Sequence, residues 1–182
     1  MRRALILACI AVAATLVPPA GRATGGRYAF AGGTPREQAQ VTRALEASSF
    51  DWNLVPQRVT IHIARVATSA ATPGEIWIDP DLLDAGSFAW GVVQHEYAHQ
   101  VDFFLLTEPA RELLMREFGA RTWCSETALR RERLGCERFA SALAWAYWPS
   151  PDNVMRSASP RELSTARFRG LVNRLVHTEG AR

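Results

Sequence analysis

The stretch that decides the fold is residues 94–102, which read Gln-His-Glu-Tyr-Ala-His-Gln-Val-Asp. In a helix, His95 and His99 lie about 40° apart around the axis and roughly 6 Å apart along it, so both imidazoles can bind one metal ion. Glu96 lies about 100° from His95, where its carboxylate can flank the ion and take a proton from water. The His-Glu-x-x-His spacing therefore predicts two zinc ligands and a neighbouring general base.

Apolar residues surround this motif on both sides. Residues 88–93 are Phe, Ala, Trp, Gly, Val and Val, and residues 101–106 are apolar apart from Asp102. A helix that is apolar nearly all round is expected to be buried. A lone histidine in such a helix would be interpreted as a core residue, whereas two histidines at this spacing, with a glutamate between them, favour a metal site.

The N-terminal segment has the features of a secretory signal peptide. Two arginines precede an uncharged run of fourteen residues, and small residues follow two prolines. Such a run is too short to span a bilayer comfortably. We predict a signal peptide over residues 1–23, with cleavage after Ala23 or alternatively after Ala20. The mature protein is then expected to be secreted or held in the cell envelope, with no stable membrane span.

The mature chain is expected to be formally neutral and to form one domain. Removal of residues 1–23 takes away three of the 21 basic residues and none of the 18 acidic ones. A neutral chain lacks the basic footprint of nucleic-acid binding, so nucleic acid is not an expected partner. We predict a flexible, glycine-rich leader over residues 24–34 and a single domain over residues 35–182. No pattern in the sequence indicates an oligomeric state.

Hydrophobic periodicity predicts an α+β fold with a mostly helical C-terminal half. Alternation marks the strands, and Thr34 followed by Pro35 is typical of a helix start. The expected helices span about residues 35–48, 80–84, 87–106, 137–148 and 159–177, the strands span residues 58–66 and 75–79, and a turn-rich link spans residues 67–74.

A third metal ligand must come from another segment, because two histidines do not complete a zinc site. Glu137 opens an apolar helical run, and the residues on its own face are small: Ala140, Ser141 and Ala144. Small side chains allow a second helix to approach the first closely, so that the carboxylate can reach the metal. Glu137 is therefore the predicted third ligand. The alternatives are Asp152, Glu126 and His177.

Two further residues of the metal helix carry a prediction. Gly91 lies one turn before His95 on the same face, and glycine inside a helix costs about 1 kcal/mol relative to alanine. It therefore indicates either the close approach of another segment or tight helix packing. Asp102 lies too far along the axis to bind a metal together with His95. We expect it to support a ligand from behind or to make a hydrogen bond between packed helices.

Cys124 and Cys136 are the two cysteines of the predicted mature chain. In an exported protein such a pair most often forms a disulfide, worth roughly 3 kcal/mol on the chain-entropy model. Because Cys136 directly precedes Glu137, the bridge would fix the start of the helix that carries the third ligand. Zinc binding by the two thiolates and a pair of free thiols are the alternatives.

The two motifs together resemble a known class of enzymes. The sequence His-Glu-Tyr-Ala-His at residues 95–99, followed 38 residues later by Glu-Arg-Phe-Ala at residues 137–140, resembles the gluzincin class of HExxH zinc metallopeptidases. The local sequence is also similar to small bacterial peptidases of the Mlc titration factor type. The resemblance covers residues 75–148. It implies a zincin-like fold, in which a small sheet lies over the metal helix, and one bound zinc ion.

Comparison with related classes adds further expectations. Leu105 stands where the extended metzincin motif has its third histidine, which excludes that class. Ser141 stands where thermolysin-like members carry an aspartate that orients a ligand histidine, so it is a candidate for contact with a ligand. Tyr147 and His177 are the candidates for stabilising an oxyanion, although a helix-capping or core role is more ordinary for each. The resemblance also implies that the strand at residues 75–79 borders the substrate cleft, with an ordinary inner or edge strand as the alternative.

These observations predict an exported zinc-dependent metallopeptidase that acts on a peptide or protein substrate. Zinc would polarise the scissile carbonyl and lower the pKa of water, while Glu96 would take the proton and pass it to the leaving amine. The first alternative is a catalytically silent zincin-fold protein that binds a partner or an envelope component. The second is a metal-free helical domain in which the motif is accidental.

Overall fold

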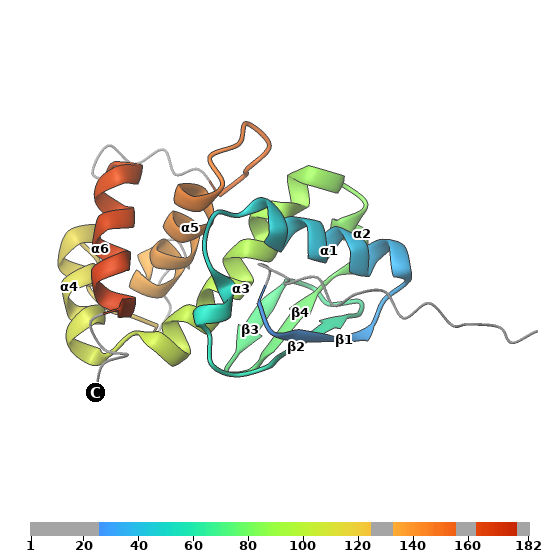
Figure 1. Cartoon of the computed structure of the whole chain (residues 1–182), viewed down its shortest axis with the longest axis horizontal. Coiled ribbons are helices and arrows are strands. Elements are labelled where there is room, and N and C mark those ends of the chain that lie inside the picture. Colours follow the sequence, from blue (N-terminus) through green and yellow to red (C-terminus); the bar gives the residue numbers. More distant parts are fainter. Residues whose placement is uncertain (1–25, 125–132, 156–162, 178–182) are drawn as a thin grey trace, which may run out of the picture.

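Helix α3 (Trp90–Leu105) runs through the middle of the molecule and separates a sheet from a group of helices (Figure 1). The computed structural model describes residues 26–124, 133–155 and 163–177. Every residue of α3 from Val93 to Asp102 is buried, as its apolar surroundings predict. The small sheet and the largely helical C-terminal half give the mixed α+β fold that the sequence predicts.

A four-stranded sheet lies on one side of α3, in the order β1-β2-β4-β3. The strands are β1 (Tyr28–Gly32), β2 (Val59–Ile63), β3 (Ala70–Thr72) and β4 (Glu75–Ile78). The first three in spatial order are parallel, and β3 runs antiparallel to β4. Alternate residues of β2 and β4 face the core, as period-two alternation requires. These buried residues are Val59, Ile61, Ile63, Ile76 and Ile78.

Two expectations about this half of the molecule are wrong. Residues 28–32 form β1 against β2, rather than part of a flexible leader over residues 24–34. Residues 70–72 form β3, rather than part of a turn-rich link. Both strands are short and rich in alanine or glycine, so their local sequence lacks the alternation that marks a strand. Because β3 occupies the sheet edge, β4 is an inner strand with a partner on each side. That this strand borders a substrate cleft stays a prediction.

Helix α1 (Pro35–Ala47) covers the sheet side of α3 and begins where the sequence predicts. Thr34 and Glu37 form a capping box, in which the Thr34 N–H donates to Glu37 Oε2 at 2.6 Å and the Glu37 N–H donates to Thr34 Oγ1 at 3.4 Å. Short turns then lead from β4 into α3. They are α2 (Pro80–Leu83) and the 3₁₀ segment η2 (Gly86–Ala89), while a second 3₁₀ segment, η1 (Trp52–Leu54), follows α1.

Three helices occupy the other side of α3 (Figure 1). They are α4 (Glu108–Phe118), α5 (Gly135–Tyr147) and α6 (Thr165–His177). Helix α5 packs directly on α3, and α6 packs on α5. The predicted signal peptide over residues 1–23 lies outside the described residues. In the ranges that the structure describes, no helix has both the length and the apolar character needed to cross a membrane.

Candidate metal centre

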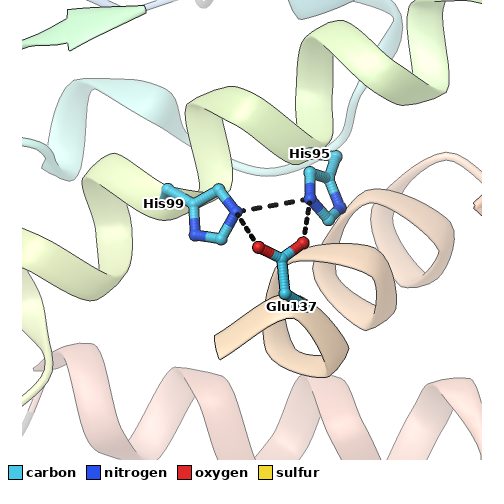
Figure 2. Close-up of side chains that lie close together, drawn as sticks. All are labelled: His95, His99 and Glu137. Carbon is cyan, nitrogen blue, oxygen red and sulfur yellow. Dashed lines mark hydrogen bonds and ion pairs between the residues drawn. The ribbon is translucent and has the colours of Figure 1, made fainter. Parts of the chain in front are cut away.

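His95, His99 and Glu137 point toward one another between α3 and α5 (Figure 2). His95 Nε2 is 3.2 Å from Glu137 Oε2 and 3.3 Å from His99 Nε2. His99 Nε2 is 3.9 Å from Glu137 Oε1. One ligand atom from each side chain therefore lies within 4.8 Å of the other two. The three side chains predicted as metal ligands meet at one place.

The local sequence of both helices explains this convergence. The four-residue spacing puts His95 and His99 on the same face of α3, one above the other. On α5, Ala140 and Ala144 are completely buried, and α3 and α5 form the most extensive helix contact of the fold. Small side chains at this contact let the two backbones come close enough for the Glu137 carboxylate to reach the imidazoles. The prediction that small residues permit this approach is consistent with the packing.

The three side chains fit a divalent cation. His95 Nε2 and His99 Nε2 face each other at 3.3 Å beside a carboxylate. An imidazole nitrogen without a proton carries a lone pair, so two such nitrogens and the carboxylate would all direct lone pairs into the space between them. The exposed fractions of His95 and His99 are only 8% and 6%, so water contributes little to satisfying these groups. Two imidazoles and one carboxylate are the donor set of known catalytic zinc sites, in which a fourth position is left for water or substrate.

Ser141 lies next to one of the ligand histidines. Its Oγ is 3.1 Å from His95 Nδ1. An imidazole that binds a metal through Nε2 keeps its proton on Nδ1, and this proton can be donated to the serine hydroxyl. Donation of this proton to Ser141 Oγ would hold the imidazole ring in one orientation. The structure thus places Ser141, a predicted contact of a ligand histidine, beside His95.

Glu96 lies in the same turn of α3 as the two histidines. It is buried, with an exposed fraction of 6%. Its side chain leaves the helix about 100° around from His95, so Glu96 is offset from the face that presents the imidazoles to α5. The cluster that could hold a metal ion consists of His95, His99 and Glu137.

Asp102 makes hydrogen bonds between packed segments. Arg111 Nε donates to Asp102 Oδ1 at 2.9 Å, and Trp123 Nε1 donates to both carboxylate oxygens at 3.0 Å. Burial raises the pKa of the Asp102 carboxyl, although the Arg111 guanidinium and these hydrogen bonds act in the opposite direction. Asp102 thus joins α3 to α4 and to the segment before the disulfide. Of the two roles expected from sequence, these contacts correspond to helix packing.

Cys124 and Cys136 form the predicted disulfide. Cys136 is completely buried in the first turn of α5, and Glu137 follows it directly. The bridge ties the start of this helix to the segment after α4. It therefore restrains the backbone that carries the third member of the metal-binding cluster, and it is compatible with an extracellular protein.

The remaining candidates lie away from the cluster or outside the described residues. Tyr147 follows Glu137 by ten residues, about 15 Å along α5, and its hydroxyl donates to Asn173 Oδ1 at 3.2 Å. The structure therefore places Tyr147 in the contact with α6 and not beside the metal ligands. His177 is exposed at the last residue of α6, and Asp152 accepts a hydrogen bond from Ser87 Oγ at 2.7 Å. Glu126 falls outside the described residues.

Sequence reasoning did not identify Met155, whose Sδ is 3.9 Å from Ser141 Oγ. The sequence contained one indication that another segment packs here, which is Gly91. A Cβ atom at this position would collide with Asn153 Oδ1 and would lie 3.4 Å from Met155 Cγ. Close approach by another segment is therefore the correct explanation of this helix glycine, and the segment is the one that follows α5.

Comparisons of the chain with protein-family models, curated proteins and solved structures found no match.

Proposed function

We propose that the protein is an exported zinc-dependent metallopeptidase of the gluzincin type, with a zincin-like fold. The observation that carries the proposal is the convergence of His95, His99 and Glu137 from two separate helices. A buried glutamate in the same helical turn as both histidines adds the acid–base group that peptide hydrolysis needs. The disulfide is in keeping with an exported chain.

The residues of the site divide the chemistry among them. His95 and His99 would hold the ion through Nε2, and Glu137 would hold it through its carboxylate. A zinc ion in this place supplies a Lewis acid that polarises the scissile carbonyl and lowers the pKa of water.

Glu96 is the proposed general base. Its carboxylate accepts a proton from the water molecule that attacks the carbonyl carbon. It then delivers this proton to the amine nitrogen as the peptide C–N bond breaks, so the carboxylate is regenerated at the end of the cycle.

The experiment that tests this function compares Glu96→Gln with wild type on a broad peptide library. We expect the variant to keep its zinc and to lose hydrolysis by on the order of 10²- to 10⁴-fold, because general acid–base catalysis contributes about this much. Glu112→Gln, an exposed change of the same kind on α4, is the matched control and should cleave like wild type. A Glu96→Gln protein that binds zinc and cleaves peptides at the wild-type rate would contradict the proposed role.

A second candidate function is a catalytically silent zincin-fold protein that binds a partner or an envelope component. It is favoured by the low exposure of the cluster, since the exposed side-chain fractions are 11% for His95, 8% for His99 and 19% for Glu137. Such a site gives a peptide little direct access. Zinc binding by wild type without hydrolysis of any peptide in the library would support this function over the first.

A further inference from the structure

The segment that follows α5 packs against the start of α3 and the end of α5. Residues 149–155, which we call the strap, form the orange loop beside the start of α3 in Figure 1. Ser87 Oγ, in η2, donates to Asp152 Oδ2 at 2.7 Å. This bond connects the strap to the segment that leads into α3.

Asn153 fixes the strap to the end of α5. Its Nδ2 donates to the carbonyl oxygens of Ala144 at 3.0 Å and Trp148 at 2.8 Å. Its Oδ1 accepts from the N–H of Met155 at 3.0 Å. The side chain is 3% exposed, so these bonds form away from water, where losing one is most costly. The amide thus sets the backbone position of Met155.

Helix α3 leaves space for the strap at Gly91. A Cβ atom there would collide with Asn153 Oδ1, so any larger residue would push the strap outward. Gly91 lies one turn before His95 on the same face of the helix. The destabilising glycine is therefore explained by the contact between α3 and the strap.

The strap reaches the metal centre through Ser141. His95 Nδ1 is 3.1 Å from Ser141 Oγ, and Ser141 Oγ is 3.9 Å from Met155 Sδ. If His95 binds a metal through Nε2, its Nδ1 carries a proton that Ser141 accepts. The serine hydroxyl hydrogen must then point elsewhere, and the Met155 thioether is a weak acceptor in its reach.

We propose that Met155 is a positioning residue of the metal centre, which the strap holds against Ser141 so that this serine orients His95 for metal binding. The inference rests on the metal site of the proposed function. It assigns the orienting role, which a single carboxylate could fill, to a serine and a methionine that come from different segments.

The test measures zinc affinity by competition with a chelator in four variants of the full mature chain. Ser141→Ala removes the acceptor for the His95 proton, and we expect roughly 10-fold weaker zinc binding, at the lower end of the range for lost outer hydrogen-bond partners. Met155→Leu keeps the size of the side chain but removes the sulfur, and we expect a loss of about 2- to 5-fold, in keeping with a weak hydrogen bond. Gly91→Ala displaces the strap without touching a ligand and should also weaken binding.

Val154→Ala is the matched control, because Val154 belongs to the strap but is 56% exposed. It should bind zinc like wild type. The visible absorption of the cobalt-substituted proteins provides a second readout, since it reports ligand geometry and does not respond to a general loss of stability. We expect altered bands for Ser141→Ala and Met155→Leu and unaltered bands for Val154→Ala.

The outcomes separate this inference from the proposed function. If wild type fails to bind zinc or cobalt, both are wrong. If wild type binds and both Ser141→Ala and Met155→Leu match Val154→Ala in affinity and spectrum, the metal site stands and the positioning role is wrong. Because Met155→Leu preserves side-chain volume, it decides the question even if Gly91→Ala fails to fold.

Discussion

The two sides of α3 use buried polar side chains in different ways. Toward the sheet, Gln100 Nε2 donates to the carbonyl oxygens of Thr72 at 2.9 Å and Glu75 at 3.2 Å, and its Oε1 accepts from the Gly74 N–H at 2.8 Å. Toward α5, the side chains of His95 and His99 face each other and the Glu137 carboxylate. Gln100 on the sheet side therefore makes hydrogen bonds to backbone groups, whereas His95 and His99 on the α5 side contact other ionisable side chains.

This difference separates residues that hold the fold from residues available for chemistry. Gln100 fastens the turn between β3 and β4 to α3, and its amide has a backbone partner for each end. The two histidines, which lie on the face of α3 turned toward α5, converge with a carboxylate from a distant segment, an arrangement that a bound cation would complete. Changes at Gln100 should therefore reduce stability, and changes at His95, His99 or Glu137 should reduce metal binding.

The largest expected effect is on metal binding. His99→Ala removes one of the three ligands, and we expect zinc affinity to fall by more than the roughly 10- to 100-fold typical of an outer hydrogen-bond partner. The unfolding free energy of the metal-free protein should fall less than in the Gln100 variant described below. Chelator competition and urea denaturation measure the two quantities. A His99→Ala protein that binds zinc as tightly as wild type would contradict the distinction between the two sides of α3.

Loss of the disulfide should affect the α5 side more than the sheet. We expect Cys124→Ser combined with Cys136→Ala to lower the unfolding free energy by about 2–4 kcal/mol. Because Cys136 precedes Glu137, zinc affinity should fall as well. Amide hydrogen exchange can locate the effect, with faster exchange at the start of α5 than in β2 or β4. Equal acceleration in both regions would show that the bridge does not act on the metal centre in particular.

Gln100→Ala tests the sheet side directly. The change leaves the Gly74 N–H and two carbonyl groups without their side-chain partner, and we expect a loss of about 2 kcal/mol in unfolding free energy. Urea denaturation of the metal-free protein gives the value. Zinc stoichiometry should remain one ion per chain at a temperature where the variant is folded. A Gln100→Ala protein that loses its zinc but keeps its unfolding free energy would contradict the roles given to the two sides of α3.

The smallest effect concerns Asp102 and depends on pH. Because burial raises the pKa of this carboxyl above 3.8, the folded state binds its proton more tightly than the unfolded state does. The contribution of Asp102 to stability is therefore fully present below pH 3.8 and is lost as pH rises through the raised pKa. Asp102→Asn removes this dependence. In the metal-free proteins, wild type should gain stability relative to the variant as pH falls through this window, and a change in the opposite direction would mean that Arg111 outweighs burial.

The convergence of His95, His99 and Glu137 could be predicted from the sequence because the signals of these residues are local. The spacing of His95 and His99 is a property of one helix, and the small residues after Glu137 indicate a close helix contact. The disulfide followed from a single remaining pair of cysteines. In each case the type of the residue and its place in the sequence were enough.

The missed features depend on contacts between distant segments. Strand β1 is recognisable only through its pairing with β2, and β3 only through its pairing with β4. Tyr147 was a candidate because of its residue type, but its place along α5 puts it against α6. The strap could not be found because the role of Met155 depends on where residues 149–155 return in space, although Gly91 gave a partial signal.

The most direct test is anomalous diffraction at the zinc edge from crystals of the mature protein grown with zinc. The account predicts one strong peak about 2.0–2.2 Å from His95 Nε2, His99 Nε2 and a carboxylate oxygen of Glu137, as zinc–nitrogen and zinc–oxygen bonds require. No peak between these side chains at saturating zinc, or a zinc ion bound elsewhere, would contradict the central claim that two helices converge to form a metal site.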